Sequence, residues 1–216
     1  MREIRIGLIG TGYMGKAHAV ALKSVASVFD TGLRPICETI CATTLEGARE
    51  KARAFGFNRA TDDWRTVVAD PAIDAVVIAS PQSTHMDIAI AAFENGKAVF
   101  CEKPLASHAE DCRRMMAAAE ASGLPNMTGF NYIRTPASQF AHDLVQSGRI
   151  GQIHYIRAEH TEDFLSDPQT PSHWRTKDIS NGCMGDLAPH IINAALRLAG
   201  PISSVSADIQ TVHSER

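Results

Sequence analysis

The sequence predicts an α/β fold in which helices cover both faces of a doubly wound parallel sheet. Three observations lead to this prediction. Strand-like and helix-like patterns alternate over residues 1–130. Residues 74–79 contain a continuous apolar run, as expected of a parallel strand that is covered on both faces. The first strand runs directly into a glycine-rich turn and a helix, which is typical of such sheets.

The first half of this alternation begins with an apolar strand at residues 4–9 and a helix over residues 14–29. A second strand at 33–37 precedes a helix over 44–55. Asp62 or Asp63 is expected to cap a short helix that ends near Ala69, before Asp70-Pro71.

The second half starts with the apolar strand at 74–79. A helix follows over residues 84–94 and ends at Asn95-Gly96, a typical helix stop. The remaining expected elements are a strand at 98–101, a helix at 107–121 and a strand at 126–130.

The composition sets limits on the class of protein. The 216 residues are 44% hydrophobic and 21% charged, which suits one large or two small globular domains. A net charge of -3 gives no reason to expect nucleic acid or an anionic membrane as partner. No apolar run is long enough to span a bilayer, and Met1-Arg2-Glu3 leads into a strand and not a signal sequence. Five cysteines without a C-x-x-C pair favour reduced thiols and a cytoplasmic location.

The glycine-rich turn is the first functional motif. Gly10, Gly12 and Gly15 fill the pattern G-x-G-x-x-G between an apolar strand and a helix. Such a turn lets the backbone approach a pyrophosphate closely and directs a helix N-terminus at its negative charge. The first domain is therefore expected to be a Rossmann domain that binds a dinucleotide.

Further candidates lie where the other strands end, because ligands bind at the carboxyl ends of parallel strands. Glu38 is expected to follow the second strand, 23 residues beyond Gly15, and to accept hydrogen bonds from the adenosine ribose. That position favours NAD over NADP, although Thr39 and Thr43 leave room for a phosphate. Lys103 follows the strand at 98–101, where its ammonium group is well placed for proton transfer beside a nicotinamide.

These motifs resemble those of the glucose–fructose oxidoreductase, inositol dehydrogenase and MocA family. The resemblance runs over the whole chain. The residues that carry it are Gly10-Thr11-Gly12-Tyr13-Met14-Gly15, Ala79-Ser80-Pro81-Gln82-Ser83-Thr84-His85, Glu102-Lys103-Pro104-Leu105, Gly129-Phe130-Asn131-Tyr132 with Arg134 and Pro136, Trp174-Arg175, and Gly185-Asp186-Leu187-Ala188-Pro189-His190.

The resemblance implies a role for each group of residues. Lys103 would contact the substrate hydroxyl and the nicotinamide ribose, His190 would exchange the proton, and Asp186 would bind a substrate hydroxyl. Asp186 and His190 are four residues apart, so on one helix they would share a face. A cis peptide is expected before Pro104. The expected cofactor contacts are Gly10, Thr11, Gly12, Tyr13, Met14, Gly15, Glu38, Ser80, Pro81, His85, Glu102 and Lys103. The expected substrate contacts are Lys103, Asn131, Arg134, Trp174, Arg175, Asp186 and His190.

The second half of the chain is expected to begin another domain. Residues 1–130 would bind NAD, and residues 131–216 would start an α+β domain for substrate binding and oligomerisation, with an open, mostly antiparallel sheet. Residues 152–161 and 202–211 would be its strands. Because family chains are generally half as long again, the chain is expected to be a fragment. A homo-oligomer, dimer or tetramer, is expected if that sheet is complete.

The sequence predicts an NAD-dependent dehydrogenase or reductase that acts on a sugar, an inositol or a related polyol. Departures from the family pattern at residues 180–189 leave the substrate open. Reduction of a non-sugar carbonyl or a trans-dihydrodiol is one alternative, and a non-catalytic NAD-binding sensor or an inactive fragment is another. No metal site is expected, because residues 159–163 alternate between the faces of a strand.

Overall fold

The computed structural model describes residues 1–173, 175–176, 181–213 and 215. The chain divides into two compact units, Met1–Gly129 and Phe130–Arg216. The division falls one residue before the boundary expected from the sequence. Each unit is described below by itself.

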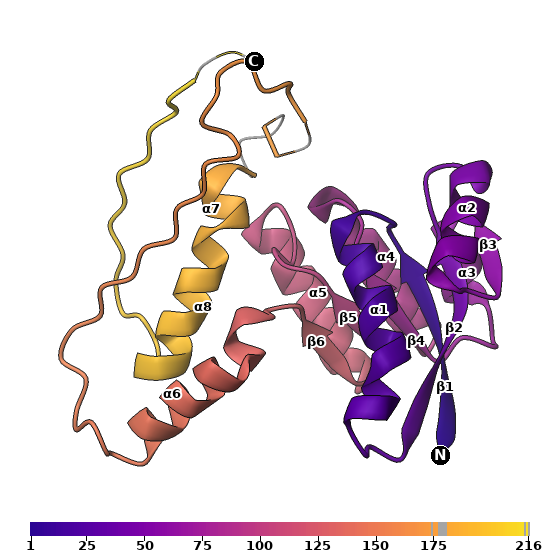
Figure 1. Ribbon diagram of the computed structural model, residues 1–216, viewed down its shortest axis with the longest axis horizontal. Coiled ribbons are helices and arrows are strands. Elements are labelled where there is room, and N and C mark those ends of the chain that lie inside the picture. The colour runs from indigo at the N-terminus through magenta and orange to yellow at the C-terminus, as the bar shows by residue number, and fades with distance from the viewer. Residues whose placement is uncertain (174, 177–180, 214, 216) are drawn as a thin grey trace. The chain divides into compact units, whose positions relative to one another are not determined.

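The first unit is built on a six-stranded parallel sheet in the order β3-β2-β1-β4-β5-β6 (Figure 1). The order reverses between β1 and β4, which is where such sheets bind ligands. The strands are β1 (Arg2–Ile9), β2 (Leu33–Cys41), β3 (Arg59–Thr61), β4 (Ala75–Ile78), β5 (Ala98–Cys101) and β6 (Asn126–Thr128).

Most strands of this sheet end at the same level. Ile9 pairs with Cys41 and with Ile78, Ile78 pairs with Cys101, and Cys101 pairs with Thr128. The residues that follow these strand ends, and so form the carboxyl edge of the sheet, are Gly10, Ala42, Ala79, Glu102 and Gly129.

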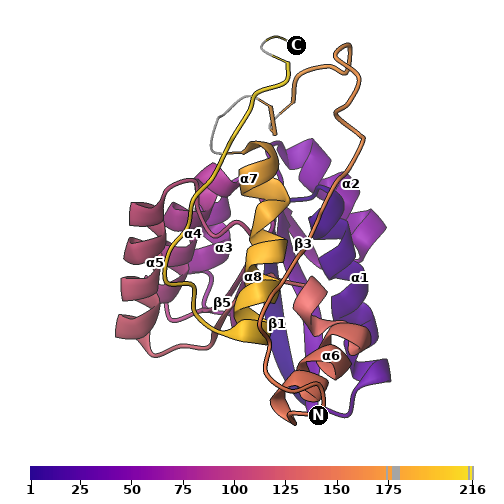
Figure 2. The same cartoon turned by 90° about the vertical axis from the view of Figure 1, so that its left-hand side faces the viewer.

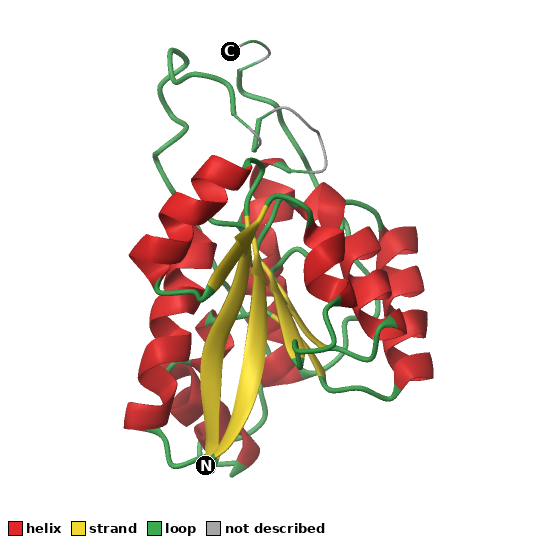
Figure 3. Ribbon diagram, turned by 90° about the vertical axis from the view of Figure 1, so that its right-hand side faces the viewer, coloured by secondary structure: helices red, strands yellow, loops and turns green. Residues whose placement is uncertain are grey.

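Helices cover both faces of the sheet (Figure 3). On one face, the apolar side chains of α1 (Tyr13–Val28) and α2 (Leu45–Phe55) pack on Leu8 and Ile40. On the other face, α3 (Trp64–Ala69), α4 (His85–Glu94) and α5 (Ala109–Ser122) pack on Val76 and Ile78. Leu8, Ile40, Val76 and Ile78 have no measurable exposure, so the sheet is the core of this unit. The two-sided cover agrees with the predicted doubly wound fold.

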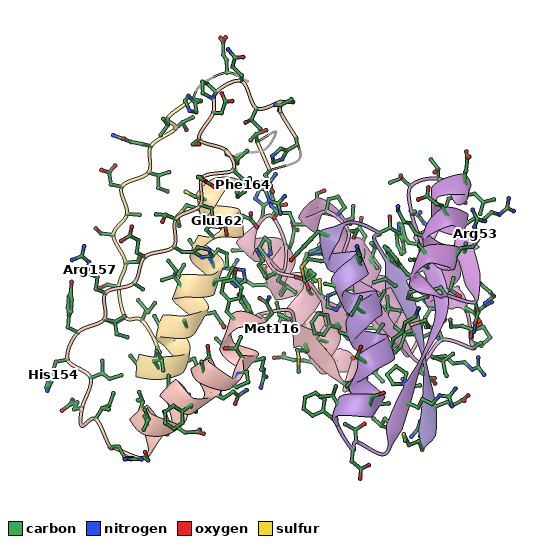
Figure 4. All side chains as sticks on the ribbon, in the orientation of Figure 1. Arg53, Met116, His154, Arg157, Glu162 and Phe164 are labelled. Atoms are coloured by element: carbon green, nitrogen blue, oxygen red, sulfur yellow. The ribbon has the colours of Figure 1, made fainter. Side chains whose placement is uncertain are left out.

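Local signals set the helix boundaries. Thr44 caps α2 by accepting a hydrogen bond from the Gly47 amide at 3.2 Å. Of the two caps considered for α3, Asp63 is the one that accepts from a helix amide, that of Arg65 at 3.0 Å. Arg53 in the last turn of α2 points away from the sheet (Figure 4). The sequence did not reveal β3, because three residues with two polar side chains carry no strand periodicity.

The second unit is helical where it has regular structure (Figure 2). After a 3-10 turn at Tyr132–Arg134, it contains α6 (Pro136–Gln146), α7 (Gly182–Asp186) and α8 (Ala188–Ala199). In the part of the chain that the structure describes, no helix is long and apolar enough to cross a membrane.

The expected antiparallel sheet of the second unit is not formed. Neither residues 152–161 nor residues 202–211 form a strand. Tyr155 and Val205 are 80% and 88% exposed, and His154 and Arg157 point away from their segment (Figure 4). Two strands without further partners are only marginally stable, because little apolar surface is buried between them.

Candidate functional site

Two glycines fix the turn after β1. Gly10 has φ of +104°, and a Cβ atom there would overlap the backbone carbonyl of Ala79. A Cβ atom on Gly15 would overlap the carbonyl oxygen of Gly10. Glycine is required at both positions because the turn packs against the end of β4 and α1 packs against the turn.

Gly12 lies at the open side of the same turn. A Cβ atom there would have no heavy atom within 4 Å. Gly12 is also the N-cap of the 16-residue helix α1, whose first turn has no side-chain cap and no acidic residue. The first amides of a helix are unsatisfied and carry partial positive charge, so they attract anions. The turn therefore has both the space and the charge that a pyrophosphate requires. Thr11, Met14 and the 86% exposed Tyr13 lie on the same segment.

The turn after β4 is held by its own side chains. Ser80 Oγ lies 2.7 Å from Thr84 Oγ1, and that hydroxyl donates to the Pro81 carbonyl at 2.8 Å. His85 is 1% exposed, with Nε2 2.9 Å from the Ser80 carbonyl oxygen and Nδ1 3.1 Å from that of Pro104. Burial lowers the pKa of His85. The buried ring of His85 therefore connects the turn after β4 to the turn after β5, and its expected contact with the cofactor stays a prediction.

Lys103 lies two residues beyond the end of β5, at the carboxyl edge of the sheet. Its side chain is half-buried, and the Lys103–Pro104 peptide is cis, as expected. Glu102 is 6% exposed, and its Oε1 lies 2.7 Å from His18 Nε2. The Glu102 carboxylate is thus engaged by His18, and its expected contact with the cofactor stays a prediction.

The prediction that Glu38 follows the second strand was wrong. β2 continues to Cys41, and Glu38 lies at a β-bulge, since Ile6 pairs with Cys37 and Gly7 pairs with Thr39. The residues that follow β2 are Ala42, Thr43 and Thr44. The sequence reason for preferring NAD over NADP is therefore lost.

Glu38 instead joins the strands of the sheet. It is 7% exposed, and its carboxylate lies 2.7 Å from Arg5 Nη1, 2.9 Å from Arg59 Nε and 3.0 Å from Asn58 Nδ2. Burial alone would raise the pKa of Glu38. Hydrogen bonds from Asn58 and Arg5, with the charges of Arg59 and Arg5, outweigh burial and hold that pKa below its usual range.

We expect Glu38→Gln to lower the free energy of unfolding at pH 7 by about 2 kcal/mol, since it weakens charge-assisted hydrogen bonds. Because the folded pKa is lowered, the wild-type contribution is full above the unfolded value of about 4.3 and is lost as pH falls through the folded pKa. Urea unfolding at pH 7 and at lower pH measures this, and the difference between variant and wild type should shrink in acid. A change in the ratio of NADH to NADPH affinity would contradict a purely structural role.

The second unit carries Asp186 and His190 on consecutive short helices and not on one helix. Asp186 is the last residue of α7, Leu187 intervenes, and His190 lies in the first turn of α8. Asp186 accepts a hydrogen bond from Arg175 Nε at 2.8 Å. The Arg175 guanidinium also lies 5.8 Å from the ring centre of Phe164, which Figure 4 labels. Arg175 is therefore a partner of Asp186.

Aromatic side chains surround His190, which is 7% exposed. Tyr132 stacks on its ring with centres 4.1 Å apart and an interplanar angle of 17°. Phe130 meets the same ring edge-on at 6.4 Å, and the His160 ring lies 6.0 Å away. His190 and His160 line a mostly apolar cavity of about 380 Å³ with Tyr132. A buried imidazole held by stacked rings has a fixed orientation, which proton transfer requires.

The other expected substrate contacts are less informative. Asn131 and Arg134 are exposed at the 3-10 turn that carries Tyr132. Trp174 lies outside the described residues.

Sequence reasoning assigned no role to three residues that shape these sites: His18, Gly129 and Tyr132. His18 lies one helical turn after Gly15 on α1, so its spacing from the glycine motif was an available signal. Gly129 and Tyr132 belong to a motif that carries the family resemblance, but their roles depend on contacts with residues distant in the chain.

Comparison with protein families matches both parts of the chain. Residues 4–130 match the sequence model of an oxidoreductase family described as having an NAD-binding Rossmann fold. Residues 138–216 match the GFO/IDH/MocA C-terminal domain.

Two curated relatives cover nearly the whole chain. Levoglucosan dehydrogenase of Pseudarthrobacter phenanthrenivorans is 41% identical over 100% of this chain and 56% of its own length. scyllo-Inositol 2-dehydrogenase (NAD(+)) of Bacillus subtilis is 34% identical over 94% of this chain and 56% of its own length. The chain thus spans about half the length of the curated relatives it matches.

Solved structures agree with these matches. Levoglucosan dehydrogenase in complex with NADH and L-sorbose has a TM-score of 0.88 and 39% identity, over 93% of this chain and 54% of that chain. An oxidoreductase domain protein from Kribbella flavida has a TM-score of 0.89 and 36% identity, over 93% and 53%. The glycine turn, the parallel sheet and the two domain matches together show that the chain belongs to the Gfo/Idh/MocA family of oxidoreductases.

Proposed function

We propose that this chain is the cofactor-binding and catalytic part of an NAD-dependent dehydrogenase that acts on an alcohol carbon of a sugar, an inositol or a related polyol. The observation that carries the proposal is the open start of α1 at Gly12, placed where the strand order reverses. An anion-binding helix start at this point is the common feature of dinucleotide sites in parallel sheets. Relatives named for NADH and NAD(+) support NAD as the dinucleotide.

The first unit would bind the dinucleotide with the amides of residues 12–15 against the pyrophosphate. When bound, the nicotinamide ring supplies a two-electron acceptor for the hydride that leaves the alcohol carbon. Oxidation of the alcohol also releases the hydroxyl proton, so the protein must supply a base.

Lys103 is proposed as the residue that contacts the reacting hydroxyl. It lies at the same carboxyl edge of the sheet as the dinucleotide turn, with β4 between the two strands that carry them, and an ammonium group there stabilises negative charge as it develops on the oxygen. Its neighbours on both sides are fixed, which limits the directions that the side chain can take.

His190 is proposed as the group that accepts the proton in oxidation and donates it in reduction. Its ring is oriented by the Tyr132 stack. Asp186, ion-paired with Arg175, would remain ionised and accept hydrogen bonds from a second substrate hydroxyl. A site that contacts two hydroxyl groups of one substrate fits a polyol. Relatives named for levoglucosan and inositols support that substrate class.

The domain roles, a homo-oligomer and a cytoplasmic location remain part of this proposal. All five cysteines are free, and burial raises the pKa of Cys41 to about 11. Free thiols support a reducing compartment.

The test measures NAD-linked oxidation by the 216-residue chain over levoglucosan, inositols, hexoses and linear polyols. NADH binding is measured in parallel by fluorescence. We expect NADH binding and turnover with one polyol class. Binding without turnover on any polyol would favour a cofactor-binding sensor or an inactive fragment, and absence of both would overturn the proposal.

A further inference from the structure

We propose that His18 and Glu102 form a buried positioning pair that orients Lys103. The contacts of the pair do not depend on the proposed function. Only the purpose of orienting Lys103, which is contact with the reacting hydroxyl, rests on it. His18 is on α1 and Glu102 follows β5, so the pair joins the helix of the dinucleotide turn to the residue before the lysine.

Glu102 is held at both ends. Its amide donates to the Ile78 carbonyl at 2.9 Å, which continues the pairing of β4 with β5. Its carboxylate is 7% exposed and lies 2.7 Å from His18 Nε2. A buried carboxylate without a donor is costly, so the His18 contact stabilises Glu102 in this position.

His18 is fixed as well. Its side chain is 17% exposed, and its ring meets Phe100 edge-on with centres 4.9 Å apart at 69°. Phe100 belongs to β5. The imidazole therefore has one preferred orientation, with Nε2 directed at Glu102.

Gly129 leaves the space that this carboxylate occupies. A Cβ atom on Gly129 would lie 2.9 Å from Glu102 Oε1 and 3.1 Å from Phe100 Cε1. The Gly129 amide donates to the Cys101 carbonyl at 2.8 Å, so its backbone cannot withdraw without breaking the sheet edge. Gly129 thus lies against the same carboxylate oxygen of Glu102 that contacts His18.

Lys103 lies between two anchored segments. Glu102 before it is bound to His18, and the carbonyl oxygens of Pro104 and Leu105 after it lie 3.1 and 3.3 Å from Nδ1 of His85. Both histidines are buried or partly buried at these contacts. Their contacts restrict the turn that carries the lysine, as outer hydrogen bonds restrict reactive side chains in other sites.

The test compares His18→Phe with His18→Gln. Phenylalanine keeps a ring against Phe100 but has no donor, whereas the glutamine amide can still donate from the position of Nε2. Gly129→Ala places a methyl group against the Glu102 carboxylate and leaves the sequence of α1 unchanged. Should His18→Phe not fold, His18→Asn, whose amide falls short of Glu102, takes its place.

The first readout does not depend on turnover. Full-length protein is treated with trinitrobenzenesulfonate, and labelling of Lys103 is followed by peptide mass spectrometry with the exposed Lys16 as internal reference. We expect Lys103 labelling to change by about threefold or more in His18→Phe and Gly129→Ala, and to stay near wild type in His18→Gln. Equal Lys103 labelling in all variants, or an equal change at Lys16, would overturn the positioning role.

The second readout compares the effect of each substitution on kcat with its effect on NADH affinity. We expect kcat to fall about tenfold or more in His18→Phe, with recovery in His18→Gln and with NADH affinity unchanged. A fall in NADH affinity that accounts for the lost rate would overturn the proposal. If the wild type shows no turnover, the proposed function fails, while Lys103 labelling still decides whether the pair orients the lysine.

Discussion

Replacing Lys103 by methionine is expected to reduce turnover by about a thousandfold and to leave NADH affinity within about threefold. Methionine keeps the length and much of the apolar stem of lysine but removes the ammonium group. Positioned acid–base groups contribute about 10²- to 10⁴-fold to rate, so the loss falls on kcat. NADH affinity should survive, because the proposed pyrophosphate site is the turn at Gly12 and not the lysine.

The matched control is Lys16→Met. Lys16 is exposed in the first turn of α1, near the pyrophosphate end of the turn. Its loss should weaken NADH binding modestly and leave kcat intact at saturating cofactor. The two substitutions are therefore expected to have opposite effects: Lys103→Met lowers kcat, whereas Lys16→Met lowers NADH affinity. If Lys103→Met raised only the KM for NAD, Lys103 would be a cofactor contact without a role in proton transfer.

The parallel sheet could be predicted from the sequence because its signals are local. An apolar run and a glycine turn depend only on neighbouring residues. Glu38 shows the limit of this reasoning. Strand continuation from Cys37 to Cys41 is set by pairing with β1 and β3, and the carboxylate finds its cations on Arg5 and Arg59, far away in the chain. A rule that counts residues from the glycine motif cannot detect the β-bulge at Glu38 or the continuation of the strand beyond it.

The second unit shows a different limit. The family resemblance led to the expectation of strands at residues 152–161 and 202–211, but a sheet also needs partners that cover one face of its strands. The ion pair of Asp186 and Arg175 could not be predicted from the sequence either. Both residues were expected to contact the substrate, and their contact with each other depends on the fold.

The His18–Glu102 pair lies between these cases. The two residues are 84 positions apart, yet each is next to a motif that the sequence does mark. The motifs predicted the turns after β1 and β5. Only the structure shows that His18 of α1 contacts Phe100 and Glu102 and so connects the two turns.

Gly12→Ala and Gly15→Ala are expected to have opposite effects, although both add one methyl group to the same motif. At Gly15 the methyl overlaps the Gly10 carbonyl, so α1 must move away from the turn. Overpacking against backbone, partly offset by the helix propensity of alanine, should cost about 2–3 kcal/mol and lower Tm by about 5–10 °C.

At Gly12 the methyl enters open space, and φ of -71° is accessible to alanine. Stability should therefore change by less than about 1 kcal/mol. The methyl would lie where a pyrophosphate approaches the first amides of α1, so NADH affinity should fall by at least about tenfold. Thermal unfolding and NADH titration of both variants give the comparison. Unchanged NADH affinity in a folded Gly12→Ala protein would mean that the dinucleotide does not bind at this turn, and the proposed function would lose the observation on which it depends.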